Sequence, residues 1–360
     1  MDETARSAPG IALTAALLAL SMAPTRLAAT LKSDRASRAD LDRMERGYYE
    51  RILDRRSVGG PESARSHTPF AYGRLAVAVD DWREYVLKAD LHTDHRGASW
   101  STNALGLRDR EYAASRPEKT VRLALVGDSI GAGWGVDDGS GFEPILEGEL
   151  DARSRSRGGP AVELLNFAVP GHAPGQRWED FRRADGWGLG VSMVVYQASM
   201  ADPGWDERRL RALLPRGLAA DAPQYLDVLT SLGVRPDLDQ ESYADLLKPH
   251  RREILANVYT SIVEECRRRH AFTLWVLIPR VGRPADPAER RALVSLARDS
   301  GFGATLDLAD AFDGLDPAAL AIAPDDHHPN AVGHARLASL LSDAFASNPS
   351  WLQAATEARR

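Results

Sequence analysis

From residue 121 onward, short apolar runs rich in β-branched residues alternate with segments whose apolar residues recur at helical spacing, and this alternation constrains the fold more than any other feature. The clear runs occupy residues 121–126, 162–167, 191–198 and 272–278, and a weaker fifth lies at 304–308. Helical periodicity marks residues 141–152, roughly 243–270, 286–299 and 330–346. Short apolar runs of this kind are typical of strands buried on both faces. The pattern therefore predicts a parallel sheet with helices on both of its faces.

The segments around this core predict the remaining organisation. Residues 31–56 are charged, as in a polar helix or spacer, and residues 70–115 carry short apolar runs broken by glycine and aspartate. Residues 203–240 interrupt the alternation as a partly helical insertion that could form a lid. We therefore expect a spacer and small strand-rich extension over 31–118, a main domain over 119–348 that contains the insertion, and a tail over 349–360. Within that domain, Ser140 and Glu143 have the spacing of a capping box at the start of the first helix.

The first 30 residues contain an apolar run at 11–23 that ends in a small-x-small sequence, as signal peptides do. The positive flank that such peptides need is weak, because Arg6 is accompanied by Asp2 and Glu3. We expect residues 1–30 to be a signal peptide or an apolar anchor, so that the protein is secreted or associated with a membrane through 11–23. A cytoplasmic protein with an apolar first helix is the alternative.

Charge and cysteine content argue against nucleic-acid binding and against a structure held together by cysteines. The formal net charge of −6 gives no sequence-wide basic surface, so nucleic acid is not an expected partner. The single cysteine, Cys266, excludes an internal disulfide and a cysteine-based zinc cluster.

Ser129 is the candidate nucleophile. The triplet Gly127-Asp128-Ser129 follows the first apolar run directly, which places Ser129 at the carboxyl end of a strand, where open α/β sheets bind ligands. The glycines that follow allow the backbone to approach a ligand closely. A plain glycine-rich turn is the alternative, whereas a dinucleotide fingerprint lacks its final glycine and the lysine of a P-loop is missing.

His328 is the candidate base. Residues 325–330 read Asp-Asp-His-His-Pro-Asn and stand just before the last helical segment. A serine hydroxyl becomes a good nucleophile when an imidazole takes its proton, and a carboxylate such as Asp325 orients that imidazole. Pro329 restricts His328 to extended backbone.

Two other interpretations of residues 325–330 stay open: a polar loop that caps the following helix, and a metal site. The metal site is disfavoured because His328 and His334 are six residues apart and fall on different helix faces. We therefore predict neither a metal nor a cofactor.

Together, the two motifs resemble those of the SGNH hydrolases, also called GDSL-type esterases and lipases, over roughly residues 121–346. Gly127-Asp128-Ser129 is similar to the family's first block, and Asp325 to Asn330 is similar to its last. The resemblance implies a flavodoxin-like three-layer α/β/α parallel sheet and a triad of Ser129, His328 and Asp325. Gly171 stands where the second block has a glycine, so the amides of Ser129 and Gly171 are implied to form the oxyanion hole. A stretch at 102–109 also resembles one that precedes the first block in many bacterial members.

The third block departs from the family pattern. Its Gly-x-Asn-Asp should fall near residues 199–202, where Ala201 replaces the asparagine that donates to the oxyanion. Loss of one such donor costs about 100-fold to 1000-fold in rate. Gln197 and Ser199 are possible substitutes, although either could instead bind the backbone at the end of the strand.

The sequence thus predicts a serine ester hydrolase that acts through an acyl-enzyme on a small-molecule or glycan-borne acyl ester. One alternative is an acyltransferase to a sugar or metabolite hydroxyl, which the possible lid over 203–240 would suit. The other is a binding protein that has kept the fold while losing rate through Ala201.

Overall fold

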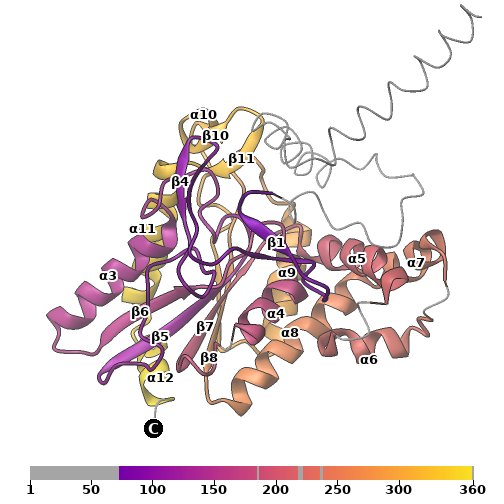
Figure 1. Cartoon of the computed structure of the whole chain (residues 1–360), viewed down its shortest axis with the longest axis horizontal. Coiled ribbons are helices and arrows are strands. Elements are labelled where there is room, and N and C mark those ends of the chain that lie inside the picture. The colour runs from indigo at the N-terminus through magenta and orange to yellow at the C-terminus, as the bar shows by residue number, and fades with distance from the viewer. Residues whose placement is uncertain (1–72, 185, 218–221, 236–237, 359–360) are drawn as a thin grey trace, which may run out of the picture. The chain divides into compact units, whose positions relative to one another are not determined.

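The computed structural model describes residues 73–184, 186–217, 222–235 and 238–358 (Figure 1). These residues belong to one compact unit of the chain. The predicted signal peptide or anchor and the spacer at 31–56 lie outside the described residues. Within the described part of the chain, none of the helices combines the length and the apolar character needed to cross a membrane.

A five-stranded parallel sheet forms the centre of the molecule, as predicted. Its strands are β5 (Thr120–Val126), β6 (Ala161–Asn166), β7 (Val191–Ala198), β8 (Phe272–Leu277) and β9 (Ala304–Asp307). The spatial order is β6-β5-β7-β8-β9. Counted from β5, this is the order 2-1-3-4-5 of flavodoxin-like sheets, in which ligands bind where the order reverses, between the first and third strands. The carboxyl ends of β5 and β7 therefore define the expected site.

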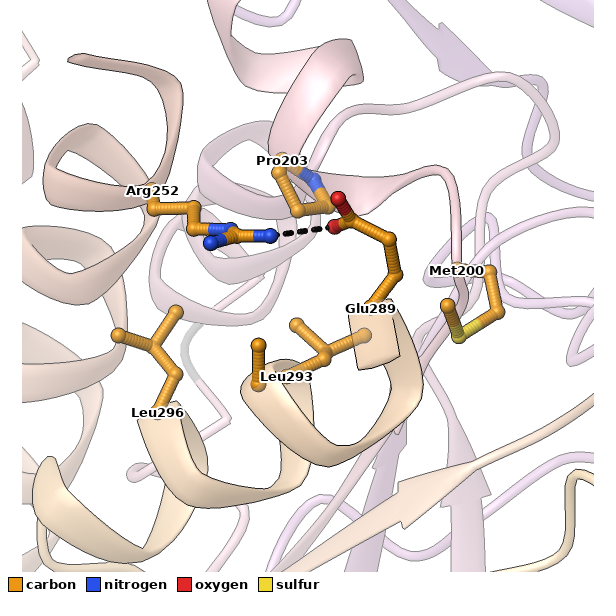
Figure 2. Close-up of a pocket in the computed structure, with 7 residues that line it drawn as sticks. Met200, Pro203, Arg252, Glu289, Leu293 and Leu296 are labelled. Carbon is orange, nitrogen blue, oxygen red and sulfur yellow. Dashed lines mark hydrogen bonds and ion pairs between the residues drawn. The ribbon is translucent and has the colours of Figure 1, made fainter. Parts of the chain in front are cut away.

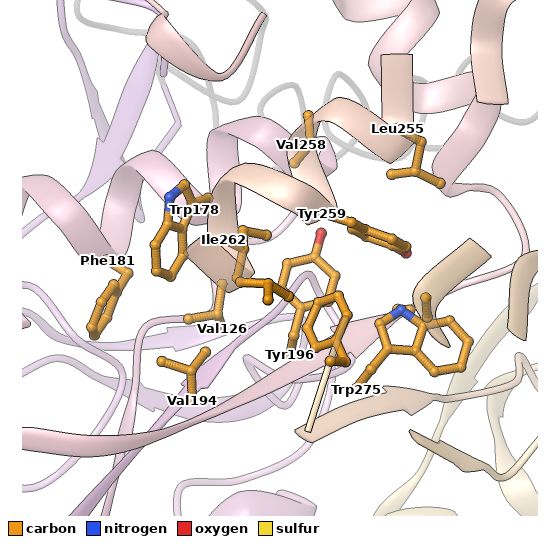
Figure 3. Packing of buried hydrophobic residues seen from close by; sticks show 14 of the residues in the cluster. Val126, Trp178, Phe181, Val194, Tyr196, Leu255, Val258, Tyr259, Ile262 and Trp275 are labelled. Carbon is orange, nitrogen blue, oxygen red and sulfur yellow. The ribbon is translucent and has the colours of Figure 1, made fainter. Parts of the chain in front are cut away.

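Successive side chains of the central strands point to opposite faces of the sheet, and each face has its own core. Leu123 and Leu125 of β5 pack on one face, and Ala124 and Val126 on the other. Figure 3 shows the second core, where Tyr196 meets the rings of other aromatic residues. Because both faces are covered, the strands read as continuous apolar runs.

Helices cover both faces and complete three layers (Figure 1). One layer consists of α3 (Phe142–Ser156), α11 (Ala331–Ser347) and α12 (Ser350–Glu357). The other consists of α4 (Pro174–Arg183), α5 (Asp202–Leu213), α6 (Pro223–Ser231), α7 (Gln240–Leu247), α8 (Arg251–Arg268) and α9 (Pro287–Asp299). Shorter helices are η2 (Leu214–Arg216), η4 (Lys248–His250) and α10 (Pro317–Leu320). The three-layer prediction is confirmed.

The structure differs from one local expectation, alters a second and agrees with a third. The prediction of a capping box formed by Ser140 and Glu143 was wrong. Gly141 is the N-cap of α3, no side chain caps this end of the helix, and the Glu143 carboxylate accepts a hydrogen bond from Asn166 instead. The helix expected over 243–270 is divided into α7, η4 and α8, because Pro249 within η4 cannot donate the backbone hydrogen bond that a continuous helix needs. The insertion is helical in its described part, as expected.

The extension before the sheet is rich in strands, as predicted. Strands β1 (Ala76–Ala78) and β2 (Tyr85–Leu87) pair with each other, and β3 (His92–His95) pairs with β4 (Ala98–Ser101). Arg108 then anchors the extension to the main domain by donating to the carbonyl oxygens of Ala132 at 2.7 Å and Val136 at 2.7 Å. The extension therefore packs against the turn that follows Ser129.

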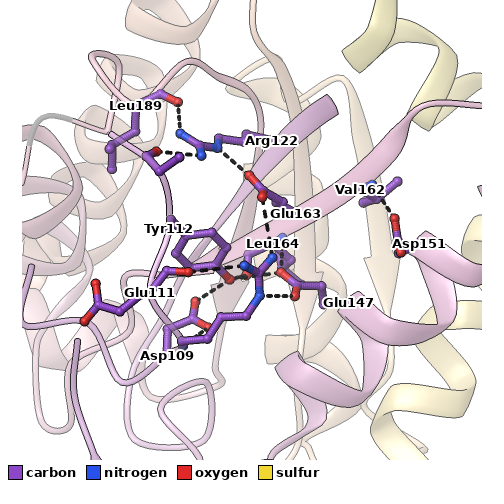
Figure 4. Close-up of polar contacts among 12 residues, drawn as sticks. Asp109, Glu111, Tyr112, Arg122, Glu147, Asp151, Val162, Glu163, Leu164 and Leu189 are labelled. Atoms are coloured by element: carbon purple, nitrogen blue, oxygen red, sulfur yellow. Dashed lines mark hydrogen bonds and ion pairs between the residues drawn. The ribbon is translucent and has the colours of Figure 1, made fainter. Parts of the chain in front are cut away.

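A partly buried polar cluster, drawn in Figure 4, fixes the chain between the extension and β5. Arg122 of β5 pairs with Glu163 of β6 at 2.6 Å and donates to the carbonyl oxygen of Leu189 at 2.8 Å. The Tyr112 hydroxyl reaches both Asp109 and Glu147 at 2.9 Å. Burial raises the pKa of Asp109 to about 7, and the charge of Glu147 acts in the same direction.

Candidate active site

Ser129 and His328 meet directly, although 199 positions separate them in the sequence. Ser129 stands in the turn after β5, and its Oγ lies 2.7 Å from His328 Nε2. Both residues are buried, with Ser129 0% and His328 3% exposed. A serine whose hydroxyl touches an imidazole nitrogen at this distance can transfer its proton as it attacks a carbonyl carbon.

Asp326, and not the predicted Asp325, supplies the carboxylate that meets the imidazole. His328 lies on β11 (Asp326–Pro329), and its Nδ1 is 2.5 Å from Asp326 Oδ1. Side chains two positions apart in an extended strand point to the same side, whereas a residue three positions away points to the other. Asp325 precedes the strand and is exposed. The sequence prediction was wrong because residues 326–329 form a strand paired with β10 (Ala321–Ala323).

The two histidines near His328, His327 and His334, form hydrogen bonds with the backbone of other elements. His327 Nδ1 is 2.9 Å from the carbonyl oxygen of Val281, and Val281 N donates to the His327 carbonyl oxygen at 2.9 Å. His334 Nδ1 accepts a hydrogen bond from Phe142 N at 3.1 Å. Within the described ranges, no group of three histidine, cysteine or acidic side chains is arranged to hold a metal ion.

The environment keeps His328 neutral and Asp326 ionised. Burial lowers the pKa of His328, the hydrogen bond that its Nδ1–H donates to Asp326 raises it, and the positive charge of Arg280 lowers it, so the net direction is downward. Burial alone would raise the pKa of Asp326, but the hydrogen bond with His328 and the charge of Arg96 hold it well below its usual range. A neutral imidazole beside an ionised carboxylate is the state that a general base requires.

Arg96 links the extension to the candidate triad. It stands between β3 and β4, and its guanidinium forms an ion pair with Asp326 Oδ2 at 2.9 Å. Its Cζ also lies 5.7 Å from the ring centre of Trp134, whose ring faces that of His328. The extension therefore helps to orient Asp326, a role that sequence reasoning missed.

The two backbone amides of the predicted oxyanion hole are available to a ligand. The Ser129 and Gly171 N–H groups have no hydrogen-bond acceptor within the described part of the chain, and both residues are buried. Buried amides without a partner are rare in native structures. Gly171 has φ +80°, which favours glycine, and its turn is held by the Tyr85 hydroxyl, which donates to the Pro170 carbonyl oxygen at 2.8 Å.

Neither predicted substitute for the asparagine is available. Gln197 Oε1 accepts from the backbone N–H of Gly131 at 2.9 Å and from that of Asp128 at 3.2 Å. Its Nε2 donates to Asp128 Oδ1 at 2.6 Å. Ser199 Oγ donates to Asp202 Oδ1 at 2.8 Å. Gln197 thus fixes the nucleophile turn, and Ser199 fixes the start of α5.

The same contact explains two glycines of the nucleophile turn. A Cβ atom at Gly127 would lie 2.3 Å from Gln197 Oε1, and one at Gly131 would lie 2.5 Å from it. Glycine at both positions allows the turn to approach the Gln197 side chain closely.

A fully buried arginine, Arg177 of α4, connects these loops. Its guanidinium lies 3.4 Å from Asp128 and 3.1 Å from Asp202, and it donates to the carbonyl oxygens of His172 and Gln197. Burial has the largest single effect on the pKa of Asp128 and would raise it, but the charges of Arg177 and Arg280 and the hydrogen bonds from Ile130 N and Gln197 together lower it. Sequence reasoning missed this residue because α4 is mostly polar and has no apolar period.

His172 follows Gly171 and forms a second histidine–aspartate pair. Its Nδ1 is 2.5 Å from Asp180 Oδ2, and its ring packs on that of Tyr85 with centres 4.5 Å apart. Because Asp180 belongs to α4 and Tyr85 to β2, these contacts hold α4 against the extension.

Two cavities lie near these elements, and no triad residue lines either of them. A cavity of about 450 Å³ separates the extension from the turn after Ser129; its lining includes Asn103, Asp109, Gly133 and Glu143. A pocket of about 10 Å³ lies between α5, α8 and α9, beneath the ion pair of Arg252 and Glu289 at 2.6 Å (Figure 2). The smaller pocket has room for about one water molecule.

No protein-family model and no curated protein sequence matches the chain. Similar solved structures include a two-domain esterase active on acetylated mannans, at 14% identity and TM-score 0.40, where the match covers 63% of this chain and about half (49%) of that one. An α/β hydrolase from the metagenome of Lake Arreo, Spain, has 21% identity and TM-score 0.39, with 62% and 95% covered. A catalytic mutant of an acetylxylan esterase from Geobacillus stearothermophilus has 18% identity and TM-score 0.39, with 61% and 92% covered. Likeness at this level assigns no activity.

Proposed function

We propose that this protein is a serine ester hydrolase of the SGNH type that acts on small-molecule or glycan-borne acyl esters. The observation that carries the proposal is the line of contacts from Ser129 Oγ to His328 Nε2 at 2.7 Å and from His328 Nδ1 to Asp326 at 2.5 Å. A nucleophile, a base and an orienting carboxylate in this relation form the arrangement used for acyl transfer through serine.

Each residue has a defined part in the proposed reaction. Ser129 Oγ attacks the ester carbonyl carbon while His328 Nε2 takes its proton, and Asp326 stabilises the imidazolium that results. The amides of Ser129 and Gly171 bind the negative oxygen of the tetrahedral intermediate. His328 then gives the proton to the leaving alcohol, and a water molecule activated by His328 releases the acyl group from Ser129.

The state of the two amides favours catalysis over a purely structural role for the turn. A buried N–H group without an acceptor costs about 1–3 kcal/mol. Two such groups are the N–H of Ser129 itself and the N–H of Gly171 in the loop after β6. A substrate oxygen would satisfy both, so the cost is recovered when the site is filled.

The test combines covalent labelling with turnover. We expect the purified protein to react with a fluorophosphonate probe and to hydrolyse p-nitrophenyl acetate, and Ser129→Ala to abolish labelling and lower kcat by about 10⁶-fold. Ser295→Ala, which removes an exposed serine of α9, is the control and should leave both unchanged. Labelling or turnover that survives in Ser129→Ala would refute the proposal.

A further inference from the structure

Arg280 is a half-buried cation beside the proposed triad that has no role in the mechanism above. It follows β8, two residues after the buried Ile278. Its neighbour Val281 forms two backbone-mediated hydrogen bonds with His327, which adjoins His328. The loop that carries Arg280 is therefore fastened to the strand that carries the proposed base.

The charge of Arg280 acts on both ends of the site. Burial has the largest effect on the pKa of Asp128 and raises it. The charge of Arg177 lowers this pKa, and the charge of Arg280 lowers it by a smaller amount. It also lowers the pKa of His328, in the same direction as burial. Within the described residues, the Arg280 guanidinium has neither an ion-pair partner nor a hydrogen-bond acceptor; its contact is with the ring of Trp205, at 5.9 Å.

Trp205 supplies a second unpaired donor at the same place. It stands on α5 one turn after Ala201, whose carbonyl oxygen accepts from Trp205 N at 3.0 Å. The side chain is 6% exposed, and its Nε1–H has no hydrogen-bond partner. Because the Trp205 ring lies against the Arg280 guanidinium, its N–H can donate to the same ligand oxygen as Arg280.

We infer that Arg280 and the indole N–H of Trp205 together bind an anionic oxygen of the substrate next to Ser129. Guanidinium groups are the preferred side chains for carboxylates and other oxyanions because they combine charge with several donors. Arg280 follows the end of β8, and Trp205 lies in the first turn of α5, just after the end of β7. Both therefore lie at the strand ends near Ala201, the residue that replaces the asparagine of the family pattern. This inference rests on the proposed function.

The anionic oxygen that Arg280 and Trp205 bind can come from two sources, and both offer the same kind of acceptor. One is the carbonyl oxygen that becomes negative in the transition state, in which case Arg280 supplies the donor missing at Ala201. The other is a permanent carboxylate on the acyl group of the substrate. The first affects kcat for every ester, and the second affects KM for charged esters alone.

The experiment compares p-nitrophenyl pentanoate with the mono-p-nitrophenyl ester of glutaric acid, which adds a carboxylate to an acyl chain of the same length. With Arg280→Gln, a loss of about 100-fold or more in kcat for both esters identifies the transition-state oxygen. A rise of about 10-fold to 100-fold in KM for the glutarate ester alone identifies the carboxylate. Trp205→Phe should give a smaller change of the same kind. Arg280→Lys, which keeps the charge, should recover part of the loss.

A binding measurement separates failure of this inference from failure of the proposed function. Glutarate is titrated calorimetrically into Ser129→Ala, with and without Arg280→Gln. If no ester is turned over but glutarate binding depends on Arg280, the anion site stands without the hydrolase. Arg283→Gln is the matched control, since Arg283 is exposed and pairs with Arg280 through its backbone only. If Arg280→Gln leaves kcat and KM for both esters unchanged, and glutarate binding does not depend on Arg280, the inference is overturned.

Discussion

At the scale of single residues, the proposed triad is defined by the direction in which strand β11 points its side chains. Asp326 and His328 stand two positions apart and face the same side, and both the side chain and the backbone N–H of His328 contact Asp326 Oδ1. Asp325 has the same chemistry but lies outside the strand. Asp326 can therefore orient the imidazole of His328, whereas the adjacent Asp325 cannot.

Exchanging each aspartate for asparagine tests this directly. Asp326→Asn should lower kcat for p-nitrophenyl acetate by about 10⁴-fold, because an amide cannot hold the imidazole in the correct tautomer or stabilise its charge. Asp325→Asn should keep kcat close to that of the unmodified protein. The reverse ranking of the two variants in steady-state kinetics would restore Asp325 as the acid of the triad.

The acid side of the pH profile should report His328. The neutral imidazole is the active form, so activity is present above its pKa and is lost as the pH falls through it. Burial and the charge of Arg280 lower that pKa, whereas Asp326 and, more weakly, Asp128 oppose the shift. We expect the acid limb of kcat/KM for a neutral ester to have its midpoint below the ordinary value of 6.5. A midpoint at or above that value would contradict the neutral, buried imidazole.

Sequence reasoning could find Ser129 and His328 because each stands in a motif whose neighbours fix the local backbone. The strand before Ser129 and Pro329 after His328 are visible in the sequence. The choice between Asp325 and Asp326 was not visible, since it depends on where β11 begins, and that depends on its pairing with β10. Arg280 and Trp205 carried no motif, because one lies in the loop after β8 and the other in the first turn of α5, and only the fold brings them together.

At the scale of elements, the hairpin of β3 and β4 adds a positioning residue to the site. Arg96 reaches Asp326 across 230 positions of sequence, and both side chains are mostly buried, at 21% and 15% exposed. No periodicity predicts such a contact. The extension could be predicted as strands from its short apolar runs, but its function could not.

Arg96→Ala should weaken catalysis moderately and leave the fold intact. An ion pair with this exposure contributes about 0.5–1 kcal/mol, which corresponds to about a 2-fold to 5-fold fall in kcat. KM should stay unchanged, because Arg96 contacts Asp326 and not the proposed substrate. Arg74→Ala is the matched control: Arg74 donates to Thr93 Oγ1 on the same hairpin at 2.8 Å and does not contact Asp326. Equal effects of the two substitutions on kcat would show that Arg96 acts only by supporting the hairpin.

At the scale of the whole molecule, the central sheet could be predicted in detail and the polar layer beneath the site could not. The four clear runs become strands that are mostly buried, and β5 and β7 are buried at every position, so burial and sequence carry the same information there. The weaker fifth run becomes β9, which is only partly buried. Helix α4 is the opposite case. Its sequence is polar, yet Gln176, Arg177, Glu179 and Asp180 are buried, because ion pairs and hydrogen bonds replace apolar contacts. The buried face of such a helix cannot be recognised from the sequence until the residues that pair with it are known.

Arg177 should therefore be the arginine on which the stability of the whole unit depends most. It is the cation that lies between the buried carboxylates of Asp128, after β5, and Asp202, at the start of α5. Arg177→Met leaves both carboxylates buried without their main partner, and loss of one member of a buried ion pair costs about 3–5 kcal/mol. The midpoint of unfolding in urea should fall accordingly, with fluorescence and circular dichroism changing together. Arg182→Met on the same helix removes a partly exposed partner of Glu179 and Glu265, and should cost about 1 kcal/mol or less. If the two variants lose equal stability, Arg177 is not the link between the nucleophile turn and α5 that its contacts indicate.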